Sequence, residues 1–237
     1  INKQLKKVFA KGNLNGEIEI PFKPNGSIGE NYLFNGKIIN ADINLSNKFG
    51  IKNLTAAIDY RNNSDLNLDR LKISVEDGSI LNLKLLGSIL EAEFREDKKN
   101  IKSSISTFGE LNFEDIKKVT SLLGIKIKNV ENFILNSNLK TSVVFDLDKK
   151  FKITNHSYST AGEIKRLQFK LKDVSFIKDF LPSFNDNIVI KNSKIRFSST
   201  SKEQKVSLQG NIKFSDNFEN FDLIHSFNKD KKKHSIK

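Results

Sequence analysis

Alternation of apolar and polar residues over long stretches is the feature that most constrains how this chain can fold. The longest run places apolar or small residues at every second position from Phe133 to Leu147. Because successive side chains of a β-strand point to opposite faces, this spacing predicts a strand with one apolar face. It is long for one strand, since the usual length is ~5–6 residues. Shorter runs of the same kind lie within residues 14–22, 34–45, 54–60, 71–75, 81–89, 164–171, 195–197 and 206–214.

Turn-like segments separate these runs, and most are short enough for hairpins, which predicts antiparallel pairing of neighbouring strands. The apolar parity shifts at Ile38–Ile39, which predicts a β-bulge. His156 lies between two runs, where we expect a turn. The fold class predicted is mainly β, with a long twisted antiparallel sheet curled into a groove and two short α-helices. The separators are 23–26, 61–64, 76–78, 148–150 and 199–202.

Two segments have helical rather than strand spacing. Phe113 to Leu123 carries apolar residues at intervals of three and four. Asn112 precedes it and Asp115 follows three residues later, a pattern typical of a capping box. The second helix is predicted from Phe176 to Leu181, and Pro182 ends it.

A triplet of Gly, a polar residue and Ile or Leu recurs along the chain. A glycine within a strand marks a bend or a bulge, so the sheet is expected to curl at intervals of about 71–75 residues. The chain has no Met and is interpreted as an excerpt of a longer one. We predict a truncated lead-in at 1–10, a repeating β-groove domain of about three quasi-repeats at 11–214, and a truncated basic tail at 215–237. The triplets begin at Gly16, Gly36, Gly87, Gly109, Gly162 and Gly210.

Composition excludes several classes of site. There is no Cys, so disulfides and thiolate metal sites are excluded. The three His residues are far apart and match no metal-binding spacing, and no nucleophile elbow or phosphate loop is present. We therefore predict a protein that is not an enzyme and has no metal and no cofactor.

The chain is basic, with 40 Lys and Arg against 28 Asp and Glu and a net charge of +12. The excess follows either from a Lys- and Asn-rich codon usage or from attraction to anionic surfaces. Arg residues form no cluster of the kind that reads bases, so nucleic acid is not a predicted partner. No apolar run approaches the ~20 residues of a membrane-spanning helix.

Strands with one apolar face need a cover, because exposed apolar area costs roughly 25 cal/mol per Å². A second sheet would give a sandwich, closure would give a barrel, and acyl chains would give a groove. The long strands favour a tall, curled sheet over the short strands of a sandwich.

Two stretches carry a resemblance to a known family. The pattern of Leu68 to Ile89 is typical of a strand that ends in an acidic-Gly turn and is followed by a second strand with the triplet Gly-x-Ile. The pattern of Asn112 to Phe145 is typical of a short helix followed by a long alternating strand. In both respects the chain resembles AsmA-like proteins and the YhdP group. The resemblance implies a repeating β-groove in the periplasm, anchored to the inner membrane through a segment outside this fragment. Such proteins carry phospholipid between the inner and outer membranes of the cell envelope, in support of outer membrane biogenesis.

The predicted partners are phospholipid acyl chains, the membrane surface and the remainder of the same longer chain. The same residues would form an ordinary dry core if the protein were a β-sandwich or solenoid that acts as a scaffold or adhesin, and this alternative stays open. The residues predicted to line the groove are Leu83, Leu85, Phe133, Leu135, Leu139, Val143, Phe145, Val206, Leu208, Ile212 and Phe214.

Overall fold

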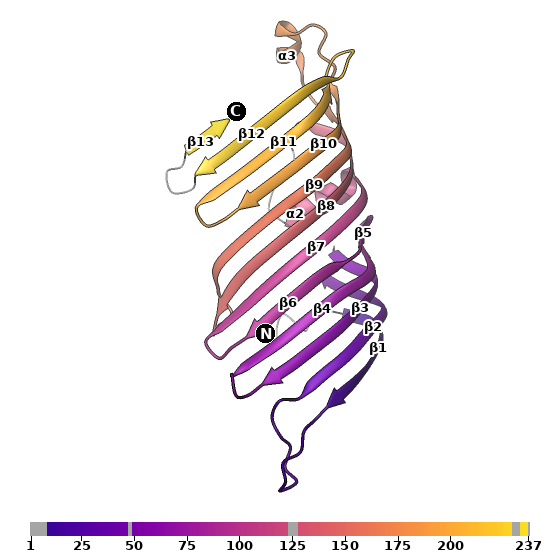
Figure 1. Ribbon diagram of the computed structural model, residues 1–237. Helices are drawn as coiled ribbons and strands as arrows, with labels where there is room; N and C mark the ends of the chain where they lie inside the picture. The colour runs from indigo at the N-terminus through magenta and orange to yellow at the C-terminus, as the bar shows by residue number, and fades with distance from the viewer. Residues whose placement is uncertain (1–8, 47–48, 123–127, 229–232, 237) are drawn as a thin grey trace. The chain divides into compact units, whose positions relative to one another are not determined.

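The computed structural model describes residues 9–46, 49–122, 128–228 and 233–236. In these ranges thirteen strands form one sheet, and nearly every strand pairs with the strand that follows it in sequence (Figure 1). The pairs are antiparallel, as hairpin connections require. The predicted fold class is confirmed: the described chain is mainly β, with a long antiparallel sheet and two short helices.

The chain divides into two compact units. Unit 1 holds the described residues of 1–80, 84–106 and 141–158, and unit 2 those of 81–83, 107–140 and 159–237. Unit 1 alone contains β1 (Phe9–Glu19), β2 (Leu33–Ser46), β3 (Phe49–Asn63), β4 (Leu68–Ile80) and β6 (Ser88–Phe94). Unit 2 alone contains β10 (Asn187–Ser199), β11 (Glu203–Lys213), β12 (Glu219–Asn228) and β13 (Lys233–Ile236). Strands with residues in both units are β5 (Leu83–Leu85), β7 (Lys98–Asn112), β8 (Val130–Asp148) and β9 (Ile153–Leu171).

The longest alternating run of the sequence lies within β8, which has 19 residues, so the prediction of an unusually long strand from Phe133 to Leu147 is confirmed. Strand β9 is equally long and begins at Ile153. It therefore includes His156, and the turn predicted there is wrong. The turn lies just before it, where the Phe151 N–H donates to the Asp148 carbonyl.

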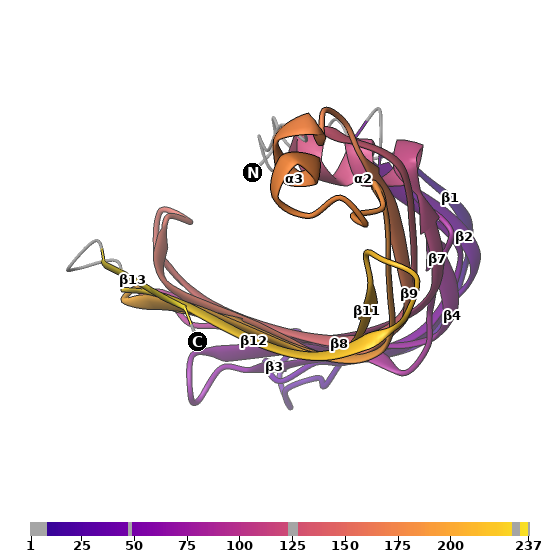
Figure 2. The ribbon, with the colours of Figure 1, turned by 90° about the horizontal axis from the view of Figure 1, so that it is seen from above.

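Register shifts bend the strands of unit 1. They fall between Lys11 and Asn13 in β1, around Asn40 in β2 and around Asn53 in β3. Asn40 and Asn53 have positive φ angles of 49° and 52°, a conformation that Asn tolerates better than most residues. An extra residue on one strand bends it, and Figure 2 shows that the strands curve along their length. The bulge predicted from the parity shift at Ile38–Ile39 is thus confirmed.

A buried apolar cluster of unit 1 lies at this bend. Ala41 and Leu54 are each 5% exposed and Ala56 is fully buried. Ile38 and Ile43 lie on either side of the β2 bulge, and both pack against the cluster. Because side chains from both halves of one strand meet there, the apolar face lies on the inside of the bend.

The two helices belong to unit 2 and are α2 (Phe113–Leu122) and α3 (Ser175–Phe180). The Asp115 N–H donates to the Asn112 side chain at 3.0 Å, and the Asn112 N–H donates to the Asp115 carboxylate at 3.4 Å. These reciprocal bonds form the predicted capping box. Helix α3 ends at Phe180, two residues before Pro182, close to the predicted stop.

The sheet continues beyond the predicted end of the repeating domain at Phe214. Strand β12 pairs with β11 over ten residue pairs, and β13 pairs with β12. The segment expected to be a basic tail therefore contributes two strands to unit 2. Four of its charged residues, Lys229–Lys232 with Asp230 among them, lie outside the described residues.

Candidate functional site

Directly paired residues of unit 1, most of them apolar, form rows that cross five or six strands on one face of the sheet. Paired residues lie on the same face, so each row is a continuous strip of side chains. Together the rows define the unit 1 apolar face. The first row is Ile18, Phe34, Tyr60, Leu71, Ala92 and Ile101; the second is Gly16, Gly36, Ile58, Ile73, Leu90 and Ser103; the third is Leu14, Ile38, Ala56, Val75 and Ser88.

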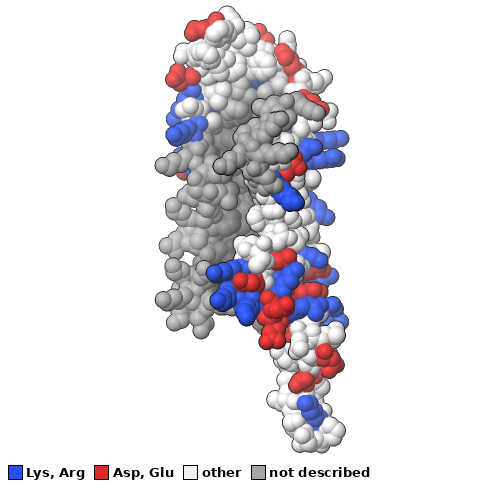
Figure 3. All heavy atoms as spheres, turned by 90° about the vertical axis from the view of Figure 1, so that its left-hand side faces the viewer, with Lys and Arg blue, Asp and Glu red and all other residues white. Residues whose placement is uncertain are grey.

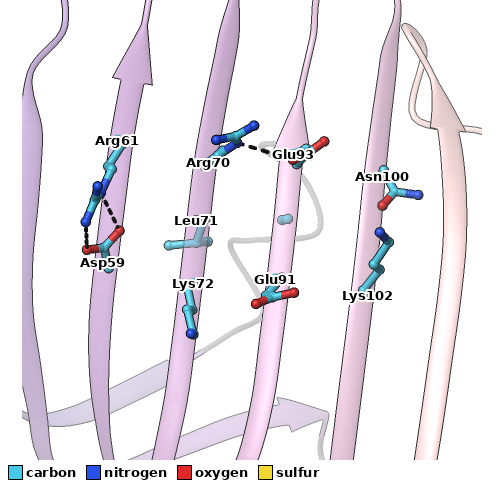
Figure 4. A pocket seen from close by; sticks show the side chains of 10 residues that line it. Asp59, Arg61, Arg70, Leu71, Lys72, Glu91, Glu93, Asn100 and Lys102 are labelled. Carbon is cyan, nitrogen blue, oxygen red and sulfur yellow. Dashed lines mark hydrogen bonds and ion pairs between the residues drawn. The ribbon is translucent and has the colours of Figure 1, made fainter.

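The opposite face of the same strands is charged. One row across β3, β4, β6 and β7 alternates in sign: Asp59, Lys72, Glu91 and Lys102. A shallow pocket of about 330 Å³ lies among these side chains (Figure 4).

Ion pairs close much of this pocket. Arg61 binds Asp59 through two hydrogen bonds of 3.0 and 3.1 Å, and Arg70 binds Glu93 at 3.2 Å (Figure 4). Exposed pairs of this kind each contribute about 0.2–1 kcal/mol to stability. We therefore interpret the residues around this pocket as cross-strand ion pairs that stabilise the sheet, and not as a ligand site.

Unit 2 repeats the two-faced arrangement. On β11, Leu208 pairs with Ile195 of β10 and with Leu223 of β12. The residues between them on β11 face the other side and are polar; Ser207, for example, pairs with Arg196 of β10 and with Ile224 of β12. The members of the unit 2 apolar face on these three strands are Ile190, Ile195, Phe197, Val206, Leu208, Ile212, Phe221, Leu223 and Phe227.

The predicted lining residues of β11 are thus brought together by the fold. Phe214 follows directly after β11, and its ring stacks on Phe184 at 6.1 Å. The prediction missed the contribution of β12, because the domain was expected to end at Phe214. Phe221, Leu223 and Phe227 lie at alternating positions of this segment, a signal of a strand that Ile224 and His225 interrupt.

The predicted residues of β5 and β8 are shared between the two units. Leu85, Val143 and Phe145 belong to unit 1, whereas Leu83, Phe133, Leu135 and Leu139 belong to unit 2. Within unit 2 the rings of Phe133 and Phe169 stack at 6.5 Å. The eleven residues therefore do not form one site within one unit but contribute to both.

The predicted lining residues are incompletely covered by protein. Leu85 is buried at 6% exposure, and the other ten are half-buried. Among the described residues, the side chains at 0–1% exposure are small: Ala56, Ser193 and Ser199. A few Leu and Ile side chains, such as Leu68 at 2% and Ile190 at 7%, are also buried. A closed core would bury its largest apolar side chains completely. Here most of the predicted lining residues keep a share of their surface accessible.

Charge is distributed without a dominant basic surface on the face that Figure 3 presents, where Lys and Arg are intermixed with Asp and Glu. Several Lys residues pair across strands with carboxylates, such as Lys37 with Glu76 at 2.6 Å. These pairs lie at the surface and are screened by salt. Over the part of the chain that the structure describes, His, Asp and Glu nowhere gather in threes as a metal site would need.

Asp146 of unit 1 is a carboxylate on the polar side of β8 that side chains of β7 hold in place. The hydrogen bond from the Asn100 amide at 2.7 Å, together with the Lys98 ammonium at 3.3 Å, lowers the pKa of Asp146 below its usual value of 3.8. Between that value and the lower pKa of the folded state, the folded protein binds fewer protons than the unfolded chain. The free energy of unfolding therefore falls as the pH drops through this range.

We expect this acid sensitivity to decrease in Asp146→Asn. The difference in urea midpoint between about pH 6 and about pH 3 should be smaller than in the wild type, because the variant has no carboxylate to protonate. Asn100→Ala, which removes the main hydrogen bond, should reduce the difference in the same direction. An unchanged pH dependence in both variants would show that Asp146 titrates alike in the folded and unfolded states.

The chain matches no protein-family model, no curated protein and no solved structure. Within the described ranges, none of the helices has the length and apolar character needed to span a bilayer. The distinctive property of both units is therefore their amphipathic sheet, with apolar rows on one side and charged or polar rows on the other.

Proposed function

We propose that this protein is a non-enzymatic lipid-binding and lipid-transfer segment, whose apolar sheet faces carry the acyl chains of phospholipids. The observation that carries the proposal is the set of apolar rows whose larger side chains stay partly exposed, backed by a polar face that water solvates. An acyl chain covers such rows without demanding hydrogen bonds. Each CH₂ group moved from water to an apolar surface contributes about 0.8 kcal/mol.

The lining suits a ligand that moves. Leu, Ile, Val and Phe contribute similar dispersion contacts, so their rows offer acyl chains many positions of nearly equal energy. On the described part of β11, the apolar residues Val206, Leu208 and Ile212 follow one another on one face, with only Gly210 between them. A lipid bound there would have a similar binding free energy at successive positions along the strand.

The resemblance to AsmA-like proteins favours a specific setting for this activity. In that setting the segment is part of a longer protein of the periplasm, anchored to the inner membrane, and moves phospholipid towards the outer membrane. Bending with the apolar rows on the inside, as in unit 1, supports this proposal because a curved face surrounds an acyl chain more completely than a flat one.

Native mass spectrometry of the protein purified without detergent tests the proposal. We expect adducts whose masses match phospholipids, released at higher collision energy and identified by lipid extraction. A mass equal to that of the bare chain under mild conditions would contradict it. That outcome would favour a scaffold or adhesin whose apolar face is covered by another protein surface.

A further inference from the structure

Lys99 is a cation on the apolar side of unit 1. It lies on β7 two residues before Ile101, a member of the first apolar row, and therefore faces the same side. Lys99 pairs directly with Phe94 of β6 and is only 8% exposed. Lysine is rarely buried to this extent unless a partner compensates its charge.

The contacts of Lys99 do not supply such a partner. Its Nζ lies 4.7 Å from the centre of the Phe151 ring, and within the described residues no carboxylate approaches it to 4.0 Å. The neighbouring Lys98, which faces the polar side, has Asp146 at 3.3 Å. Among the described residues no buried side-chain nitrogen lacks a hydrogen-bond partner, so the tip of the Lys99 side chain reaches water although most of the side chain is buried. The cation–π contact leaves its N–H donors available to the oxygen of a ligand that displaces this water.

Lys99 lies at the edge of the unit 1 apolar face, in the row next to the first apolar row. The next row along the strands is Asn62, Asp69, Phe94 and Lys99. The Asp69 carboxylate accepts a hydrogen bond from the Asn62 amide at 2.6 Å and also hydrogen-bonds Tyr60 of the neighbouring row. Lys99 is thus the cation of a partly polar row that borders the unit 1 apolar face.

We propose that the Lys99 ammonium binds the anionic headgroup of an amphiphile whose acyl chains lie along the unit 1 apolar face. The inference rests on the proposed function and adds an orientation to it: headgroup oxygens at Lys99, acyl chains over the rows of Ile101 and Leu90. The chemistry recognised is a phosphate or carboxylate oxygen, since these accept charge-assisted hydrogen bonds from an ammonium group.

Lys99→Met tests this assignment, because methionine keeps an unbranched apolar stem and removes the charge. The matched control is Lys102→Met, which removes the same charge from the exposed, opposite face of the same strand (Figure 4). Binding of phosphatidic acid and of diacylglycerol with identical acyl chains is measured by native mass spectrometry. These two lipids differ only in the phosphate group.

We expect the wild type and Lys102→Met to prefer phosphatidic acid by about 10-fold, the size of one charge-assisted contact. Lys99→Met should lose this preference while it still binds diacylglycerol. Lys99→Arg should retain the preference, which separates loss of charge from loss of folding. Circular dichroism checks that all variants are folded.

The other outcomes distinguish the proposal that the apolar faces bind lipid from the proposal that Lys99 binds the headgroup. Equal preference in the wild type and Lys99→Met would overturn the role of Lys99 and leave lipid binding intact. Failure of both lipids to bind the wild type would overturn lipid binding itself. Displacement of phosphatidic acid from the wild type by millimolar inorganic phosphate, with no loss of diacylglycerol, would identify a free-anion site and overturn the headgroup assignment.

Discussion

Leu208→Asp should remove bound phospholipid from the β11 region of unit 2 and lower total co-purified phospholipid severalfold. Leu208 lies between Ile195 and Leu223 on the apolar face and is half-buried. A carboxylate there keeps its hydration only if acyl chains stay away, since burial of an unpaired charge costs several kcal/mol. The measurement is the amount of phospholipid extracted per mole of purified protein.

Ser207→Asp is the matched control, because its side chain lies on the opposite face, one residue away. Ser207 pairs with Arg196 on one side and with Ile224 on the other, so a carboxylate at this position gains a favourable partner in Arg196. We expect its lipid content to equal that of the wild type. Both variants should remain folded, because Leu208 is only half-buried and its replacement should cost the fold about 1–2 kcal/mol.

Two results would contradict this interpretation of the unit 2 apolar face. Unfolding of Leu208→Asp, with Ser207→Asp intact, would show that Leu208 belongs to a dry core. Unchanged lipid content in a folded Leu208→Asp would show that acyl chains do not lie against this part of β11.

Gly162→Ala should destabilise unit 2 by about 3 kcal/mol, the combined size of a strained backbone and a steric clash. Gly162 lies in β9 with a φ angle of 157°, and a methyl group there would collide with the Asn138 carbonyl of β8. The added atom would also lie 2.9 Å from the Leu139 Cα. Both obstacles are backbone atoms, which cannot move aside without disturbing the strand.

Gly87→Ala separates the clash from the backbone conformation. Gly87 has a φ angle of 62°, and an added Cβ would meet nothing within 4 Å. Its replacement should therefore cost only about 1 kcal/mol, the conformational penalty alone. Urea unfolding followed by circular dichroism measures both variants, and equal midpoints would show that the β8–β9 contact relaxes around the extra atom.

Local patterns in the sequence predicted most of the strands, because the side-chain period of a strand is a property of consecutive residues, but no run was predicted over β7. The run from Phe133 to Leu147 predicted β8, and Asn112 with Asp115 predicted the start of α2, since a capping box involves only four neighbouring positions. The same alternation separated the apolar residues of β11 from the polar ones. It failed at residues 76–78, which lie inside β4 and not in a turn, at His156 inside β9, and beyond Phe214. At these places short polar stretches within strands resembled turns and a tail.

Cross-strand register was decided only by the tertiary structure, because it depends on residues far apart in the sequence. Gly162 carries no local sign that the Asn138 carbonyl lies beside it, and Lys99 resembles any other lysine of this basic chain. Only pairing of β7 with β6 places Lys99 at the border of an apolar face. The sequence by itself thus determined which residues share a face, whereas the fold determined which faces bend, which neighbours meet and how much apolar surface stays accessible. The reason is that alternation acts along one strand, while bulges and pairing act between strands.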